Sequence, residues 1–395
     1  MTVAQRRLAT LSSSAAEDQR PTAETSKLAA RPDLKPFIKW PGGKSQELPL
    51  IAAAAPPLPG RLIDPFVGGG AVLLATPVEV PAWCNDLCPE LIGIYQGAAR
   101  GDADLRSCLA GLDDGWDRLG TLEGLYADLA AAYVGGASIS PDTALARNGA
   151  SMAAAVEPAG VELLRLIDAR LARDLAAKFD RMNRVEAKVG RRLNEGDRLA
   201  NIEGAVRATF YYAVRSRYNA VRAAGGLEAQ RLADFFFLRE FAYAAMFRFN
   251  PQGAFNVPYG GLTYNRKSFA SKVEALYSPG MLARLRATHW RCVDFETFLG
   301  EAQPSAADFV FVDPPYDSDF SRYDDRPFGS LDQARLCDAL EALTSNVMVV
   351  IKDTPLIRQL YGGSRWRVAE ARKTYMWTIK SRNDREASHL VITDY

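Results

Sequence analysis

Side chains that bind metals or form disulfides are scarce in this sequence. It has only two histidines, His289 and His389, and five cysteines, none of them in the Cys-x-x-Cys pairs typical of zinc sites. Five is also an odd number, which does not suit a framework of paired disulfides. We therefore expect no metal site, and we expect the cysteines to be small buried residues.

Long apolar runs are missing as well. The longest, such as residues 51–58 and 347–351, fall well short of the roughly 20 residues that cross a bilayer. The N-terminal stretch carries Arg6 and Arg7, but neither an apolar block nor the cleavage site of a secretory signal follows them. These absences predict a cytoplasmic protein without a membrane span.

The net charge is close to zero, because 48 basic residues stand against 47 acidic ones. The composition as a whole therefore does not indicate a nucleic-acid partner. Within residues 165–222, however, there are 14 Lys or Arg and only 7 Asp or Glu. A basic face of this kind is expected where phosphates dock, although a solvated helical surface has the same composition.

The pattern of apolar runs predicts an α/β fold. Strands are expected at residues 61–67, 78–84, 308–312, 346–351, 366–378 and 388–393. A helix over residues 331–344 lies between two of them, and one of the last two strands suits an antiparallel edge. Strands that alternate with helices favour a mostly parallel sheet, with functional residues at the carboxyl ends of its strands.

The chain divides into a tail, an α/β domain in two pieces, and an insertion. Residues 1–34 are polar and rich in Ala, without a sustained period, which predicts a flexible tail. The expected strands fall in residues 35–103 and 281–395. The segment between these pieces, 104–280, is helical and rich in Arg, with an apolar helix expected over 235–249. We interpret it as a mainly helical domain inserted into the α/β domain.

The most specific motif is Asp313-Pro314-Pro315-Tyr316, directly after the expected strand at 308–312. Two prolines end a sheet ladder and stiffen the backbone, so that a carboxylate, a carbonyl and an aromatic ring are held in one rigid turn. Such a turn suits an amino group on a nucleobase. Asp313 and the Pro314 carbonyl would accept its two hydrogens, and Tyr316 would stack on the ring. We therefore predict that this loop is catalytic.

A Gly-rich turn, Gly68-Gly69-Gly70, follows the first expected strand, which contains Asp64. Missing side chains let the backbone approach a nucleoside there. The glycine spacing does not match the dinucleotide pattern, which argues against NAD. Asp86 ends the next strand, where a carboxylate can bind ribose hydroxyls; capping of the following helix is the alternative role.

Seven motifs, in order, resemble those of the D12 class of DNA adenine methyltransferases, which includes the Dam-like enzymes. The motifs are Pro36-Phe-Ile-Lys-Trp-Pro-Gly-Gly-Lys44, Pro65-Phe-Val-Gly-Gly-Gly-Ala-Val72, Asn85-Asp86, Phe210-Tyr-Tyr212 with Arg217-Tyr-Asn219, Arg248-Phe-Asn250, Gly253-Ala-Phe-Asn-Val-Pro-Tyr-Gly260 and Asp313-Pro-Pro-Tyr316. The resemblance covers about residues 35–395. It implies a Rossmann-like sheet with an inserted target-recognition domain. It also implies an enzyme that uses S-adenosylmethionine to methylate the exocyclic amino nitrogen, N6, of adenine in double-stranded DNA, after rotating the base out of the helix.

The resemblance also implies roles for single residues. Together with the Gly-rich turn, it implies cofactor contacts at Trp40, Lys44, Asp64, Phe66, Gly68, Gly70, Asp86, Asp313 and the pair Asp294-Phe295, which would flank the cofactor adenine. It implies DNA contacts at Lys39, Arg217, Tyr218, Asn219, Arg248, Asn250 and Pro258. A simple hairpin with a proline at its edge is the structural alternative for the stretch around Pro258.

The chain departs from the Dam-like pattern where the target sequence is read. Gly261-Leu262 stand where enzymes that read GATC carry an Arg-Tyr pair, so GATC is not predicted. In addition, 28 residues lie between Asn219 and Arg248, more than such enzymes need. These departures favour a restriction or phage-defence system as the setting. Transfer to N4 of cytosine, an RNA substrate and a non-catalytic DNA-binding relative stay open as alternative hypotheses.

Overall fold

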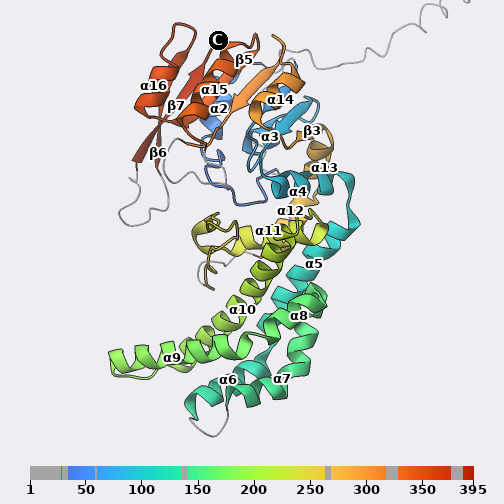
Figure 1. Cartoon of the computed structure of the whole chain (residues 1–395), viewed down its shortest axis with the longest axis vertical. Coiled ribbons are helices and arrows are strands. Elements are labelled where there is room, and N and C mark those ends of the chain that lie inside the picture. Colours follow the sequence, from blue (N-terminus) through green and yellow to red (C-terminus); the bar gives the residue numbers. More distant parts are fainter. Residues whose placement is uncertain are drawn as a thin grey trace, which may run out of the picture.

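The molecule has two regions, a sheet with helices packed against it and a set of helices that extends away from the sheet (Figure 1). This computed structural model describes residue 28 and residues 34–57, 60–135, 140–262, 268–316, 328–374 and 386–395. Most of the expected tail lies outside the described residues, as does the part of the expected 366–378 strand beyond Thr374. Leu28 and Leu34 are buried in the core, so packing begins before Lys35.

Seven strands of the described chain form one mixed sheet in the order β3-β2-β1-β4-β5-β7-β6. They are β1 (Leu62–Asp64), β2 (Ala82–Asn85), β3 (Thr288–Arg291), β4 (Phe309–Val312), β5 (Asn346–Lys352), β6 (Arg367–Thr374) and β7 (Glu386–Thr393). β1 to β5 are parallel, and β7 runs antiparallel to both β5 and β6. The expected α/β class with a mostly parallel sheet and an antiparallel edge is confirmed.

Both faces of the sheet are buried because successive residues of its central strands are apolar. In β4, Phe309 and Phe311 pack into one hydrophobic cluster, whereas Val310 and Val312 pack into another. A strand with two apolar faces needs a covering layer on each side. The helices that cover the first face are α2 (Leu48–Ala54), α3 (Ala71–Ala75) and α4 (Pro89–Arg100). Those that cover the second face are α14 (Phe295–Ala302), α15 (Ser330–Glu341) and α16 (Pro355–Leu360).

Three strands differ from the expectation, while the helix expected at 331–344 is confirmed as α15. The strand expected over 61–67 ends at Asp64, directly before Pro65. The strand expected over 78–84 begins only at Ala82. Pro81, directly before it, has no amide hydrogen for the ladder. β3 was not expected at all, because its four residues, Thr-His-Trp-Arg, make no apolar run. It is nevertheless paired with β2 along its whole length.

Between α4 and β3 the described chain is mainly helical. The elements are α5 (Ala103–Arg118), η1 (Leu119–Thr121), α6 (Glu123–Val134), α7 (Pro141–Val156), η2 (Glu157–Ala159), α8 (Val161–Asp168), α9 (Leu171–Val189), α10 (Glu195–Ala223), α11 (Ala229–Phe241), η3 (Tyr243–Ala245), α12 (Phe269–Leu276) and α13 (Pro279–Arg286). Side-chain caps begin several of them: Asp102 accepts a hydrogen bond from the backbone N–H of Leu105, and Asn194 accepts one from that of Asp197. No described helix is long and apolar enough to cross a bilayer.

The apolar helix expected over 235–249 is wrong in its second half. α11 ends at Phe241, and Ala242 is already extended. Isolated bridges pair Ala242 with Tyr259 and Phe249 with Phe255, so the chain after α11 is drawn into a hairpin rather than a longer helix. Within it, the rings of Phe247 and Phe249 each lie 5.8 Å from that of Phe255.

The two regions are joined through α4, α5, α10 and α11. α11 packs against α4, which lies on the sheet, and against α5 and α10. α10 is 29 residues long and runs from its contact with α11 down to α9, which extends to the side in Figure 1. The helical region therefore packs directly against α4, the helix that follows Asp86.

Candidate active site

A cavity of about 950 Å³ opens at the carboxyl ends of β1, β2 and β4. The strand order places it there. β1 lies between β2 and β4, and the loops that follow neighbouring strands on opposite sides of such a switch point diverge. Every residue predicted to be catalytic or to bind the cofactor lines this cavity, namely Trp40, Lys44, Asp64, Phe66, Gly68, Gly70, Asp86, Asp294, Phe295, Asp313, Pro314, Pro315 and Tyr316.

The Gly-rich turn after β1 requires its glycines. Gly68 and Gly70 adopt left-handed φ values of 47° and 74°. A Cβ on Gly68 would lie 2.7 Å from Cδ1 of Trp40, closer than real Cβ contacts. Asp86 braces the turn, because its Oδ2 accepts a hydrogen bond from the Gly68 N–H at 3.1 Å while its Oδ1 accepts one from the Cys88 N–H at 2.9 Å. The carboxylate thus supports the start of α4 and still borders the cavity.

Asp64, at the end of β1, is a buried carboxyl that is 2% exposed. Its Oδ1 accepts a hydrogen bond from the Phe66 N–H at 3.1 Å. Burial raises the pKa of Asp64 well above its usual value, and the negative charges of Asp313 and Asp86 act in the same direction. Through the hydrogen bond to Phe66, the side chain of Asp64 supports the turn after β1.

Lys44 ties the loop of residues 313–316 to the N-terminal motif. Its ammonium donates to Oδ1 of Asp313, to the carbonyl of Gly42 at 3.0 Å and to the hydroxyl of Tyr316 at 3.4 Å. The side chain of Lys44 is 2% exposed and that of Asp313 is 20% exposed. A charge this deeply buried needs a partner. The pair therefore fixes where the carboxylate of Asp313 lies in the cavity wall.

Buried side chains that no motif indicated support the same loop. Nε2 of Gln333 donates to the carbonyl of Pro315 at 2.8 Å. His389, on β7, is fully buried, and its ring packs edge-on against Tyr316 with 5.5 Å between centroids. Nδ1 of His389 lies 2.7 Å from Oε1 of Glu47, just before α2. These residues come from distant parts of the chain, so a local motif could not reveal them.

Aromatic rings form one corner of the cavity. The ring of Phe66 lies 5.7 Å from that of Phe295 and 5.7 Å from that of Phe328. Arg335 of α15, which the sequence did not single out, lies with its guanidinium 4.9 Å from the Phe295 ring and pairs with Asp294 at 3.0 Å. An apolar slot with a charged rim suits a planar heterocycle.

The profile of the D12 class N6 adenine-specific DNA methyltransferases matches residues 40–118 and 172–375, more than half of the chain. The chain belongs to this family. The expectation drawn from the seven motifs is confirmed, and the activity of the family is adenine-specific methylation of DNA.

Individual relatives of this D12 methyltransferase are similar over different lengths. A type II methyltransferase of Lactococcus lactis subsp. cremoris, M1.LlaDCHI, is 25% identical over 371 residues, which are 92% of this chain and 96% of that protein. The type II methyltransferase M.CviBI of Paramecium bursaria Chlorella virus NC1A is 32% identical over 165 residues, 41% of this chain and 60% of the viral protein. The retron Ec67 DNA adenine methylase of Escherichia coli is 33% identical over 162 residues, 40% of this chain and 53% of the methylase. The similarity to the last two thus spans little more than half of their length.

Five of the residues predicted to meet DNA keep part of their surface exposed in the methyltransferase. They are Lys39, Asn219, Arg248, Asn250 and Pro258. Asn219 fixes the hairpin that follows α11, because its side chain exchanges hydrogen bonds with the backbone of Phe255 at 2.8 and 3.1 Å. Nε of Arg248 donates to Oδ1 of Asn256 at 3.0 Å, within the same hairpin.

Arg217 and Tyr218 are interior residues, and their prediction as DNA contacts is corrected by the structure. Arg217 is 2% exposed, and its guanidinium makes two hydrogen bonds to Asp234 of α11, at 2.7 and 2.9 Å. Tyr218 is fully buried and donates its hydroxyl to Oε1 of Glu90 at 2.8 Å. Tyr218 therefore links α10 to α4, which lies on the sheet, whereas Arg217 holds α10 and α11 together within the helical region.

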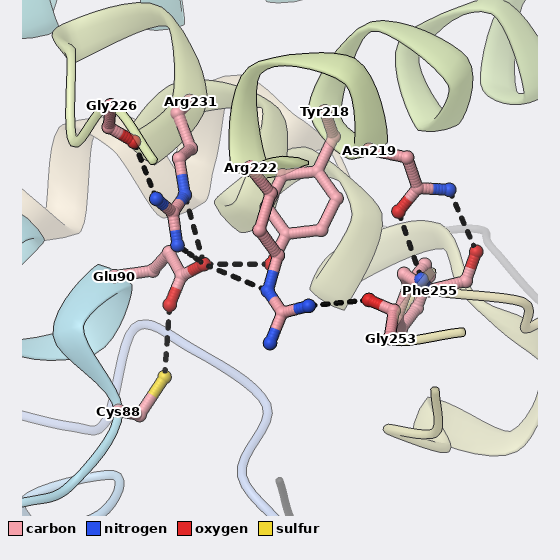
Figure 2. A network of polar contacts seen from close by, with 9 residues as sticks. All are labelled: Cys88, Glu90, Tyr218, Asn219, Arg222, Gly226, Arg231, Gly253 and Phe255. Atoms are coloured by element: carbon pink, nitrogen blue, oxygen red, sulfur yellow. Dashed lines mark hydrogen bonds and ion pairs between the residues drawn. The ribbon is translucent and has the colours of Figure 1, made fainter. Parts of the chain in front are cut away.

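Figure 2 shows that Glu90 of α4 is the centre of this junction. Besides Tyr218, Arg231 donates to its Oε1 at 2.6 Å, and Nε of Arg222 lies 4.0 Å from the same oxygen. Arg222 also donates to the carbonyl of Gly253, and it lines the cavity. The junction therefore connects the cavity wall with the hairpin that carries Arg248 and Pro258.

An exposed aromatic residue near the hairpin was missed by the sequence interpretation. Tyr243, in η3, is 48% exposed, and its N–H donates to the carbonyl of Pro258 at 2.9 Å. Ala244 follows with a φ of 53°, a conformation that alanine rarely adopts. A backbone in this conformation persists only where the surrounding structure enforces it. The signal in the sequence was only a tyrosine among small residues.

Proposed function

We propose that this methyltransferase transfers a methyl group from S-adenosylmethionine to N6 of adenine in double-stranded DNA, with the loop of Asp313, Pro314, Pro315 and Tyr316 receiving the base. The observation that carries the proposal is the single cavity at the carboxyl end of the sheet. It contains both the loop that suits an amino group and the Gly-rich turn that suits a nucleoside. Ligands of doubly wound sheets bind at such crevices.

The chemistry of the cavity fits the cofactor. Its volume of about 950 Å³ leaves room for a nucleoside beside a base. The backbone at Gly68 and Gly70, the carboxylate of Asp86 and the aromatic corner would hold sugar and adenine, while the ammonium of Lys44 suits a carboxylate. When bound, S-adenosylmethionine supplies a methyl group on a positively charged sulfur. The proposed contacts are Trp40, Lys44, Asp64, Phe66, Gly68, Gly70, Asp86, Asp294, Phe295 and Asp313.

The loop would act by positioning. Asp313 and the Pro314 carbonyl accept the two amino hydrogens, which turns the lone pair of N6 toward the methyl donor. Tyr316 stacks on the purine that has left the helix, an extrusion that costs a few kcal/mol. N6 would form the new N–C bond to the methyl group as the S–C bond breaks, with the electron pair of that bond left on the sulfur as a neutral thioether. N6 would then lose one hydrogen as a proton to Asp313 or to water. Holding donor and acceptor in line can supply roughly 7–11 kcal/mol of such a barrier.

We assign DNA docking to the surface around the hairpin. Lys39, Asn219, Arg248, Asn250 and Pro258 form it in this proposal, and the exposed ring of Tyr243 joins them. Residues 104–280 would then be the target-recognition domain, inserted between the catalytic pieces 35–103 and 281–395. A restriction or phage-defence system is the proposed setting, since two similar proteins are named type II methyltransferases.

The experiment that tests the proposal identifies the modified base. The purified protein is incubated with isotopically labelled S-adenosylmethionine and DNA from a methylation-free host, and the DNA is digested to nucleosides. Asp313→Asn is compared with Asp353→Asn. Asp353 is another carboxylate just beyond the end of a parallel strand, and it pairs with Arg358 at 2.7 Å. Asp353 does not line the cavity.

We expect label in N6-methyladenine, a loss of about 100-fold or more in Asp313→Asn, and unchanged transfer in Asp353→Asn. Label in N4-methylcytosine would move the enzyme to the rival base. Transfer to RNA alone would replace the substrate. Full activity in Asp313→Asn would refute the role of the loop.

A further inference from the structure

α9 is an amphipathic helix on the outside of the helical region. Its buried residues are Leu171, Leu175, Phe179 and Met182, and it packs against α7 and α10. In Figure 1 it projects sideways from the lower part of that region. The family profile does not match residues 119–171, which include α7, so part of the support beneath α9 lies outside what the family profile covers.

The opposite face of α9 carries a stripe of cations. Arg173, Arg181, Arg184 and Lys188 are all exposed. With 3.6 residues per turn, these four side chains fall within an arc of about 80°. We call them the α9 stripe. Two acidic residues flank it, Asp180 at one edge and Asp174 at the other, and Nε of Arg173 lies 3.7 Å from Oδ1 of Asp174.

Three of the four stripe residues differ from paired arginines on neighbouring helices. On α5 and α10, Arg118 pairs with Asp114 and Arg207 pairs with Glu203, each one turn away. In the part of the chain that the structure describes, Arg181, Arg184 and Lys188 have no ion-pair partner. A row of exposed cations on a projecting helix creates a positive potential that attracts a polyanion.

We propose that the α9 stripe docks the phosphate backbone of duplex DNA at a distance from the target base. The inference rests on the proposed function, because it takes duplex DNA as the substrate. From Arg173 to Lys188 the stripe extends about 22 Å along the helix axis. This length corresponds to about six or seven base pairs of duplex. The stripe therefore lengthens the bound DNA segment without reading its sequence.

The test measures how binding depends on duplex length. Fluorescence anisotropy gives Kd for labelled duplexes from about 14 to about 38 base pairs, each between about 50 and about 200 mM salt. The wild-type chain is compared with Arg173→Gln/Arg181→Gln/Arg184→Gln/Lys188→Gln. Gln has nearly the helix propensity of Arg and Lys, so the fold should survive, which thermal melts check. Lys178→Gln, on the same helix but off the stripe, is the matched control, and Arg181→Gln and Arg184→Gln serve if the fourfold variant melts early.

We expect the wild-type affinity to rise with length and the fourfold variant to lose at least about tenfold on the longest duplex but less than about twofold on the shortest. The salt slope on long DNA should fall by up to about 3.6, and Lys178→Gln should match the wild type. Equal affinities of variant and wild type at every length would overturn the proposal. So would an unchanged DNA affinity combined with lost binding to vesicles of anionic lipid.

Failure of the proposed function would look different. Methyl transfer to the same duplexes is measured in parallel, with the target site included once sequencing has located it. A wild-type chain that binds long DNA through the stripe but methylates no duplex would contradict the proposed function and leave the stripe intact. A chain that methylates short and long duplexes alike, with or without the stripe, would contradict only the stripe.

Discussion

The carboxyl end of the sheet and the helix α10 both carry motif residues, yet their side chains have opposite fates. At the sheet, every predicted residue borders the cavity. On α10, Arg217 and Tyr218 are buried against α11 and α4, while Asn219 beside them keeps part of its surface. In a parallel sheet the topology alone decides where strand ends meet. On a helix, exposure depends on what packs over each face, and that packing comes from distant sequence.

The largest effect should come from breaking the buried pair on α10. Arg217→Met leaves Asp234 uncompensated in the interior, which should cost about 3–5 kcal/mol of unfolding free energy. Urea unfolding measures it. Arg217→Met/Asp234→Leu removes both charges and should recover part of the loss. A stable Arg217→Met variant whose only defect is weaker DNA binding would restore Arg217 to the DNA surface and end the contrast.

A smaller effect is expected on the exposed side of the same comparison. Arg248→Gln should leave the melting temperature unchanged, since Arg248 is exposed and, among the described residues, its side chain hydrogen-bonds to Asn256 alone. The affinity for duplex DNA should fall about three- to tenfold, and the salt slope by about 0.9, because one phosphate contact is lost. Anisotropy titrations check both values. Arg147→Gln, an exposed arginine of α7, is the control and should change neither; an Arg248→Gln variant that behaves like it would remove the hairpin from the interface.

The cavity side can be probed through a residue that no motif indicated. His389→Gln removes the edge-on contact with Tyr316. An aromatic contact of this kind contributes about 0.5–1.5 kcal/mol, so kcat should fall about three- to tenfold while cofactor affinity stays the same. Single-turnover methylation and a cofactor titration separate the two. The other histidine provides the control. The ring of His289 packs on that of Trp83 with 4.0 Å between centroids, and His289→Gln should retain full kcat. A loss of kcat equal in both variants would show a general disturbance of the fold.

The smallest effect concerns Asp113 of α5, a carboxyl in the helical region that resembles Asp64 in the cavity. Burial raises the pKa of Asp113 to about 6, with Asp117 adding to the effect. The folded state thus holds its proton more tightly than the unfolded state. The contribution of protonated Asp113 to the free energy of unfolding is complete below about pH 4 and is lost as the pH rises through about 6.

Asp113→Asn should therefore melt higher than the wild type at about pH 8, by the equivalent of about 1 kcal/mol after allowing for partial exposure, and match it at about pH 4. Differential scanning calorimetry at the two values measures this. A pH-independent difference would mean that the carboxyl is not titrating between folded and unfolded states.

The same contrast explains what could be predicted from the sequence. Asp64, Asp86 and Asp313 were found because each stands at or just beyond the carboxyl end of a strand, where parallel topology brings them together. Gln333 and His389 were missed because their partners, Pro315 and Tyr316, are reached only through tertiary packing.

Local pattern failed in two further places. β3 has no apolar run and is a strand only because β2 offers it an edge. The helix expected beyond Phe241 was wrong because Ala242 and Phe249 pair with a segment further along the chain. In both cases long-range backbone pairing overrides the local preference of the residues.

A structure with a non-reactive cofactor analogue and a duplex containing the target site tests the central claim most directly. We predict an adenine rotated out of the helix, with N6 within hydrogen-bond distance of Asp313 and the Pro314 carbonyl, its ring on Tyr316, and the analogue against Gly68 and Asp86. An extruded base bound elsewhere, or an analogue outside the cavity at the ends of β1 and β4, would contradict it.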